Sequence, residues 1–292
     1  MNQAIRKLSG VKENQILSEF TTFKIGGPAD WFYQAKSEED LIKAIDFCYD
    51  QKIPFFILGG GSNLLITDKG FRGMVIKLEN KEGKVLEEKI IVDSGLKLGE
   101  LVNLATDNDL SGLEFLVGIP GTVGGAVVGN AGAWQQNIGD KIERVKVLDE
   151  RKQIQWFNRI DCQFAYRQSR FKKKKEIILA VEFSLKKENH LIIKEKIKEY
   201  LAKRQSQPKS FSAGCIFINP KPKVAGSLIE ECDLKGTRIN NAEISPIHAN
   251  FIINHGGAKA KDVLELISLA KKKVKEKFGI DLEEEIIILG EL

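Results

Sequence analysis

Two glycine-rich stretches are the parts of this sequence best suited to hold a ligand with the backbone. The longer one, residues 118–133, contains six glycines and no charged residue. The shorter one, residues 59–63, directly follows the apolar run 55–58. Glycine lets a backbone approach a ligand closely, and neighbouring free N–H groups can surround an anion. Tight turns around a buried strand are the alternative explanation, and the pattern alone leaves it open.

Neither stretch has a common phosphate-binding fingerprint. No GxxxxGK followed by Ser or Thr occurs, and no GxGxxG turn is followed by an acidic residue about 20 positions later. Backbone loops without a phosphate-binding lysine favour an extended cofactor with a pyrophosphate, and FAD would fit. The residues expected to contact it are Gly59, Gly60, Gly61, Ser62, Asn63, Gly118, Thr122, Gly124, Gly125, Asn130, Gly132 and Ala133.

Three polar side chains elsewhere could take part in chemistry. Arg167 follows Tyr166 between apolar segments, Cys215 follows a glycine, and Glu285 opens the last apolar run. A guanidinium can clamp a carboxylate or a phosphate, but a surface arginine, a core cysteine and a solvated glutamate explain the same pattern. His248 and His255 have no metal-ligand spacing, so we expect no metal site.

Composition narrows the class of protein. The chain has 292 residues, 42% hydrophobic and 29% charged, with a net charge of +5. This mild, scattered charge suits an anionic small substrate better than nucleic acid. No apolar run reaches the ~18 residues of a membrane helix, and the first twenty residues lack a signal-peptide core. The four cysteines have no C-x-x-C pair, which favours a reducing cytoplasm, and nothing indicates an obligate protein partner.

The elements that must position these residues alternate between helix and strand. Residues 1–20 read as a helical lead-in, and Ser37 is expected to cap a helix with Asp40 in the capping-box position. The other expected helices are 98–109, 191–204, 225–232 and one ending at Phe278. The expected strands are 31–35, 55–58, 74–78, 90–93, 145–149, 177–185, 248–254 and 282–290. Lys172 to Lys175 are expected on a solvated turn, and 205–209 reads as a domain boundary.

Eight blocks, taken together, carry a resemblance to a known family. In order they are TTFKIGGPAD, ILGGGSNLLI, GLEFLVGIPGTVGGAVVGNAGA, AYRQSRFK, SAGCIFINP, AGSLIEECDLKG, HANFIIN and FGIDLEEEIIILGE. They cover nearly the whole chain and resemble the UDP-N-acetylenolpyruvoylglucosamine reductases (MurB), flavoenzymes of peptidoglycan precursor synthesis. The resemblance implies an α+β fold: an FAD-binding half of the vanillyl-alcohol oxidase (PCMH) type and a C-terminal α+β substrate-binding domain. We expect the first at 1–190, divided near residue 70, and the second at 205–292, with the last strand a candidate to return to the active site.

The resemblance also implies roles for single residues. NADPH would reduce FAD, and the reduced flavin would reduce an enolpyruvyl ether to give UDP-N-acetylmuramate. Arg167 matches the catalytic arginine of the family, Cys215 its proton donor, and Glu285 its terminal glutamate, with Glu283 or Glu284 as fallback. The implied substrate-binding residues are Tyr166, Asn219 and Lys203, with Arg204 as the alternative to Lys203.

Two features depart from the family pattern. The proton donor is usually a serine, and only ten residues separate Ser169 from Ala180, too few for a tyrosine-bearing loop of one branch. The chain therefore resembles the shorter second type. Because a free thiol has a pKa of ~8.5, we expect activity to fall at a lower pH than with serine at position 215. A vanillyl-alcohol-type oxidase and a non-catalytic nucleotide- or RNA-binding protein are the alternatives.

Overall fold

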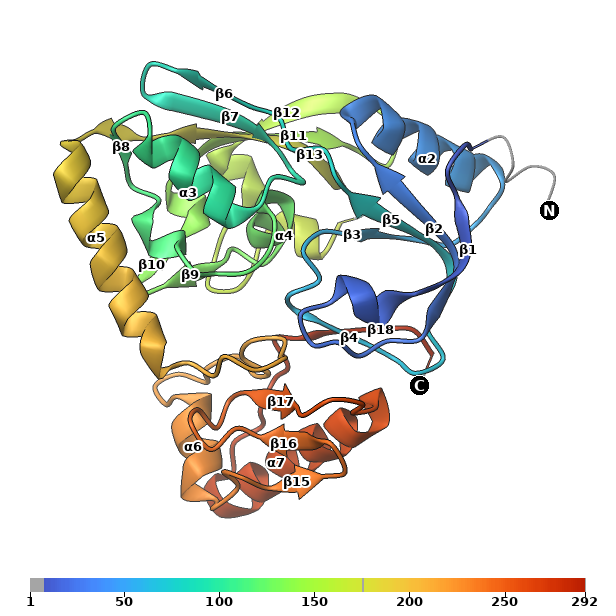
Figure 1. Cartoon of the computed structure of the whole chain (residues 1–292), viewed down its shortest axis with the longest axis vertical. Helices are drawn as coiled ribbons and strands as arrows, with labels where there is room; N and C mark the ends of the chain where they lie inside the picture. Colours follow the sequence, from blue (N-terminus) through green and yellow to red (C-terminus); the bar gives the residue numbers. More distant parts are fainter. Residues whose placement is uncertain (1–7, 175, 292) are drawn as a thin grey trace.

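The computed structural model describes residues 8–174 and 176–291. Figure 1 shows two larger sheets side by side and a small helix-and-strand unit below them. The helical lead-in expected over residues 1–20 is wrong where it can be seen: β1 (Lys12–Ile16) and the 3-10 helix Leu17–Phe20 occupy it. β1 forms because it pairs with the strand over residues 28–35, and the sequence of residues 12–16 alone does not reveal that partner. Residues 1–7, Lys175 and Leu292 lie outside the described residues.

The first sheet has the order β1, β2 (Pro28–Ala35), β5 (Phe71–Leu78) and β3 (Phe55–Leu58). β2, β5 and β3 are parallel, so their carboxyl ends lie at one edge. α2 (Glu38–Asp50) packs on this sheet, and the hydroxyl of Ser37 accepts a hydrogen bond from Asp40 N, as expected. The expected capping box does not form, because the Asp40 carboxylate accepts from Lys36 N and not from Ser37 N. Because β5 pairs within this sheet, we move the division between the two subdomains from residue 70 to the connection after Leu78.

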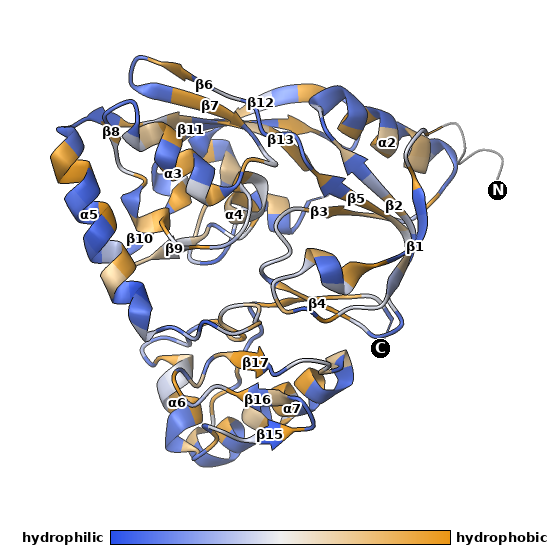
Figure 2. Ribbon diagram, viewed as in Figure 1, coloured by the Kyte–Doolittle hydropathy of each residue, from blue (hydrophilic) through white to orange (hydrophobic). Residues whose placement is uncertain are grey.

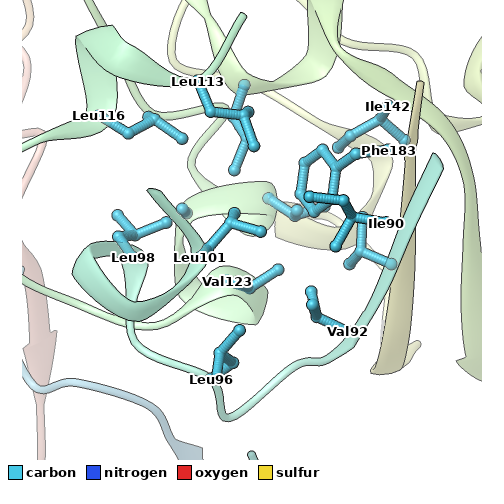
Figure 3. Packing of buried hydrophobic residues seen from close by; sticks show 14 of the residues in the cluster. Ile90, Val92, Leu96, Leu98, Leu101, Leu113, Leu116, Val123, Ile142 and Phe183 are labelled. Atoms are coloured by element: carbon cyan, nitrogen blue, oxygen red, sulfur yellow. The ribbon is translucent and has the colours of Figure 1, made fainter. Parts of the chain in front are cut away.

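The second sheet is antiparallel, in the order β12 (Ile154–Asn158), β11 (Ile142–Leu148), β13 (Ile177–Ser184), β7 (Lys89–Asp93) and β6 (Gly83–Leu86). α3 (Leu98–Thr106) and α4 (Val123–Val128) cover one face. In Figure 3 Leu101 of α3 and Val123 of α4 point toward Phe183 and Val92 of the strands. The long glycine-rich stretch is therefore fixed to the sheet by its apolar residues; among its glycines, Gly118 and Gly125 are exposed and Gly124 is buried.

α5 (His190–Lys203) leads from the second sheet to the C-terminal unit. That unit contains α6 (Ala225–Glu231), the three-stranded sheet β15 (Arg238–Ile239), β16 (Ala242–Ile244) and β17 (Ile252–Asn254), and the long helix α7 (Ala260–Phe278). Figure 2 shows hydrophobic residues along the strands of the larger sheets, and hydrophobic and hydrophilic residues alternating along α5 and α7. The strand expected at 248–254 forms only over its last three residues.

The chain then returns to the first half of the molecule. β18 (Ile287–Leu289) pairs in parallel with β4 (Leu64–Ile66), directly after the short glycine-rich stretch. The strand expected over 282–290 is thus three residues long, because Glu285 N hydrogen-bonds to Ile216 O before β18 begins. The remaining short strands are β8 (Leu110–Ser111), β9 (Gly132–Ala133), β10 (Gln136–Asn137) and β14 (Lys186–Lys187). Within the described residues, no helix has the length and apolar character needed to cross a membrane.

Candidate active site

The two glycine-rich stretches touch each other beside a crevice. A Cβ added at Gly60 would lie 2.5 Å from Cα of Gly121, so the two backbones are too close for larger residues. Ser62 Oγ donates a hydrogen bond of 2.9 Å to Pro120 O and ties the stretches together. The 59–63 loop follows the carboxyl end of a parallel strand, the edge at which open sheets of this kind bind ligands.

A cavity of about 890 Å³ opens beside these loops. Gly60, Gly121 and Thr122 line it together with Phe20 and Lys97. Thr122 Oγ1 is buried without a hydrogen-bond partner among the described residues. A buried hydroxyl without a partner is costly, and a bound polar group removes that cost. The glycine cradle, the cavity and the unpaired Thr122 hydroxyl therefore fit a long ligand carrying phosphates, such as FAD.

The three residues predicted to be catalytic come together in one cluster. Arg167 Nε lies 2.8 Å from Glu285 Oε1, and Arg167 Nη2 donates to Gly132 O at 3.1 Å. The Nε–H does not point along the line to the carboxylate, so the contact is an ion pair without hydrogen-bond geometry. The charges of Arg167 and Glu285 both act on the Cys215 thiol. This arrangement joins residues from three distant parts of the chain.

Burial dominates the electrostatics of this cluster. Burial raises the pKa of the Cys215 thiol to about 12, with the negative charge of Glu285 adding to the effect. The thiol is therefore protonated at neutral pH and well above it. Burial likewise raises the pKa of Glu285, against the opposing effects of Arg167 and Lys172. The site thus holds one neutral acid beside a carboxyl group whose proton is retained to a higher pH than usual.

The loop that carries Arg167 is held by the long glycine-rich stretch. Asn130 Nδ2 donates to Ala165 O at 2.8 Å, and Gly139 N donates to Asn130 Oδ1 at 3.0 Å. Ser169 Oγ donates to Val128 O at 2.7 Å. Both polar ends of the Asn130 side chain are therefore engaged inside the protein. The cofactor contact of Asn130 stays a prediction, while its side chain holds the arginine loop in place.

Several other residues predicted to bind the cofactor also make contacts within the protein. Gly118 packs against Arg204, Gly124 against Ser94, and Gly59 against Thr122. Gly61 has a φ of 63°, which favours glycine in the loop. Gly125 is exposed on α4, while Gly132 and Ala133 form β9, which supports Arg167. Close backbone packing alone thus accounts for several of the glycines.

The predicted substrate-binding residues have different surroundings, and Tyr166 among them contacts Arg167. Tyr166 is 42% exposed, and its ring centroid lies 5.5 Å from Cζ of Arg167. Asn219 Oδ1 accepts a hydrogen bond from Ala225 N at the start of α6. Lys203 Nζ lies 5.1 Å from the Tyr200 ring, at the end of α5. Arg204, the alternative to Lys203, is engaged by the carbonyls of Val117 and Phe115 and is therefore structural.

The position of the glutamate follows from its neighbours. Glu284 Oε1 pairs with Lys271 Nζ at 2.8 Å, away from Arg167, and Glu283 is exposed. Glu285 alone of the three contacts Arg167. Lys172 was missed as a site residue, because it belongs to a run that reads as a solvated turn. Its positive charge opposes the rise in the pKa of Glu285. Its position five residues after Arg167 was the sequence feature that could have indicated this role.

Comparison with known proteins gives this architecture a class. Residues 29–158 match the family model of an FAD binding domain. A variant of the glucose oxidase Phl p 4 shares the fold, with a TM-score of 0.50 and 15% identity over 64% of this chain and 44% of that one. The first half of the molecule therefore matches an FAD binding domain and shares its fold with that oxidase, and the chain is α+β as expected.

Closer relatives give the family. Residues 207–289 match the C-terminal domain of UDP-N-acetylenolpyruvoylglucosamine reductase. Reductases of that name from Caldanaerobacter subterraneus and Clostridium novyi are 44% and 42% identical, over 95% and 96% of this chain and 93% and 92% of theirs. The crystal structure of the enzyme from Thermus caldophilus has a TM-score of 0.83 and 38% identity, covering 95% of this chain and 98% of that one. The chain belongs to the UDP-N-acetylenolpyruvoylglucosamine reductase family.

Proposed function

We propose that this chain reduces the enolpyruvyl group of UDP-N-acetylglucosamine enolpyruvate to give UDP-N-acetylmuramate, with FAD as resident cofactor and NADPH as reductant. The contact of Arg167 with Glu285 beside the Cys215 thiol is the observation that carries the proposal. The names of the relatives support the same reaction. In this proposal the cavity beside the two glycine-rich stretches holds the cofactor.

The chemistry supplied by bound FAD is hydride transfer from NADPH to carbon 3 of the enolpyruvyl group. Arg167 orients the substrate carboxylate and stabilises the negative charge that develops on it. Its Nε–H is not spent on a hydrogen bond within the protein, which leaves it for an incoming carboxylate. Because Arg167 stabilises this negative charge, carbon 2 can then accept a proton.

Cys215 supplies that proton in this proposal. A donor has to be protonated at working pH, and burial keeps the Cys215 thiol neutral. One hydride at carbon 3 and one proton at carbon 2 complete the reduction of the double bond. The thiolate left behind is disfavoured by burial and by the charge of Glu285. Burial also raises the pKa of Glu285, and in this proposal the protonated form of Glu285 returns a proton to the sulfur.

The remaining residues bind the UDP-sugar in this proposal. Lys203 and Asn219 are assigned to the diphosphate and Tyr166 to the mouth of the site. Lys172 adds a positive charge near Glu285, in a chain that has no room for a tyrosine loop between Ser169 and Ala180. We place the reaction in the cytoplasm with small molecules as the only obligate partners, an inference supported by the four free cysteines.

An anaerobic absorption experiment tests the function. The purified protein is expected to show a flavin spectrum that NADPH bleaches and that stoichiometric UDP-N-acetylglucosamine enolpyruvate restores. A matched sample receives UDP-N-acetylglucosamine, which lacks the enolpyruvyl group, and is expected to stay bleached. Rapid return of colour with oxygen but none with the enolpyruvyl sugar would favour an oxidase and rule out the proposed reductase.

A further inference from the structure

We propose that Asn63 is a positioning residue for Glu285, and that the side chain of Asn63 serves the carboxylate segment and not the cofactor. The inference rests on the proposed function for the role of Glu285. Asn63 ends the short glycine-rich stretch, where a side chain facing bound FAD was expected. Its amide instead points to the other end of the sequence.

Two hydrogen bonds join Asn63 to the segment that carries Glu285. Asn63 Nδ2 donates to Glu285 O at 3.0 Å, and Ile287 N donates to Asn63 O at 3.0 Å. The Glu285 N–H donates in turn to Ile216 O at 2.8 Å. Both backbone groups of Glu285 are thus satisfied, one by the Asn63 amide and one by the residue after Cys215. These two hydrogen bonds hold the backbone of Glu285 and thereby fix the position from which its side chain extends.

The side chain is needed because the strand pairing stops short of the glutamate. The register of β18 with β4 starts at Ile287 opposite Leu64, two residues beyond Glu285. Main-chain pairing therefore does not reach Glu285 O, and the Asn63 amide provides its hydrogen bond. Removing the amide leaves a half-buried carbonyl without this donor, and the residue just before the ladder becomes free to shift.

The same loop faces the crevice on its other side. Gly60 lines the cavity and lies against Gly121, while Asn63, three residues on, holds the glutamate. The loop therefore links the proposed cofactor crevice to the proton-handling residues. A shift of Glu285 would lengthen its 2.8 Å contact with Arg167, on which the second half of the reaction depends.

The experiment compares Asn63→Ala and the size-matched Asn63→Asp with Asn108→Ala, all as FAD-loaded full-length protein. Asn108→Ala removes the same kind of hydrogen bond, from an asparagine amide to a backbone carbonyl, but the acceptor is Leu104 in α3, outside the site. Stopped-flow absorption measures reduction by NADPH and reoxidation by the enolpyruvyl sugar separately. In both Asn63 variants we expect reoxidation at saturating sugar to slow roughly 10- to 100-fold, the effect of a displaced catalytic group. We expect their reduction by NADPH and their FAD affinity, from flavin fluorescence, to stay close to wild type.

Asn108→Ala is expected to keep the wild-type ratio between the two half-reactions. Equal slowing of both half-reactions in the Asn63 variants would overturn the inference, and so would loss of FAD affinity with normal reoxidation. Hydrogen exchange adds a readout independent of turnover: the Ile287 amide is expected to exchange faster in Asn63→Ala than in Asn108→Ala. A wild-type protein that the sugar does not reoxidise would refute the proposed function, while the exchange result would still decide whether Asn63 holds this segment.

Discussion

Arg167 owes its orientation to an unusual backbone conformation. Its φ is 54°, in a turn where the backbones of Ala165 and Gln168 exchange two hydrogen bonds. A non-glycine residue in the left-handed region costs about 1–2 kcal/mol, which the fold has to offset. The hydrogen bond from Asn130 to Ala165 O and the hydrogen bond from Ser169 to Val128 O supply that offset. The guanidinium is therefore preorganised next to Glu285.

Arg167→Lys keeps the positive charge but loses the forked donor geometry. Reduction of the flavin by NADPH is expected to survive, because that half-reaction does not involve the enolpyruvyl carboxylate. Reoxidation by the enolpyruvyl sugar is expected to slow by roughly 10²-fold, the scale of one lost donor to a developing anion. Stopped-flow absorption separates the two steps. An equal collapse of both would make Arg167 a cofactor or folding residue.

The surroundings of Cys215 change the pKa expected for its thiol. From a free thiol one expects a pKa of ~8.5 and an early loss of activity at alkaline pH. Burial instead raises the pKa to about 12, so the proton that the thiol has to donate is lost only as the pH rises toward that value. The alkaline difference expected between Cys215 and serine thus disappears over the usual working range.

Cys215→Ser is expected to stay active, whereas Cys215→Ala is expected to lose roughly 10²- to 10⁴-fold in reoxidation, the range of general acid catalysis. Wild type and Cys215→Ser are expected to have parallel pH profiles at every pH well below 12. The check is stopped-flow reoxidation of the three proteins across that range. A near-wild-type rate for Cys215→Ala would assign the proton to another group.

At the scale of elements, the close approach of two loops shapes the site. Residues 59–63 follow β3, whereas the 118–133 stretch is anchored through α4 to the other sheet. The glycines let the two loops touch, and Ser62 ties them by one hydrogen bond. The width of the crevice is therefore set by how the sheets pack.

Gly60→Ala and Gly125→Ala test this contact as a matched pair. The added Cβ at Gly60 would meet Gly121 Cα at 2.5 Å, and we expect a loss of about 1–3 kcal/mol in unfolding free energy together with weaker FAD binding. At Gly125 the added Cβ finds only an ordinary 3.6 Å contact with Thr122 Oγ1. Gly125→Ala is therefore expected to stabilise the exposed helix by about 0.5–1 kcal/mol. Urea unfolding measures both, and equal stability of the two variants would contradict the close approach.

At the scale of the whole molecule, the last segment of the chain completes the site built by the first. β18 returns to β4, and the glutamate before it meets an arginine from the second sheet and a cysteine from the C-terminal unit. The crevice is thus assembled from all parts of the fold and lies within folded structure. Bound FAD would depend on that structure for its retention.

Release of the flavin by acid tests how it is held. Neither glycine-rich stretch contains a histidine or a cysteine that could form a flavin link. Denaturing the holoprotein in acid is therefore expected to leave all of the yellow colour in the supernatant, and absorption of the supernatant and of the redissolved pellet measures this. Colour that stays with the precipitated chain would indicate a covalent flavin at another residue.

From the sequence alone, the family, the FAD-binding half and Arg167, Cys215 and Glu285 as candidates could be predicted. Each of these predictions rested on short sequence motifs, which can be recognised without the tertiary structure. The sequence did not decide between neighbouring glutamates, and tertiary structure placed Glu285 against Arg167.

Other properties depend on contacts between distant segments. The raised pKa of Cys215 comes from burial, and burial is a property of the packed molecule. Asn63 and Asn130 look alike as polar residues of glycine loops, yet their amides bond to Glu285 and Ala165, 222 and 35 residues away. The first strand and the short last strand exist because β2 and β4 are there to pair with them. Such long-range pairing leaves no local pattern, so only the tertiary structure could reveal it.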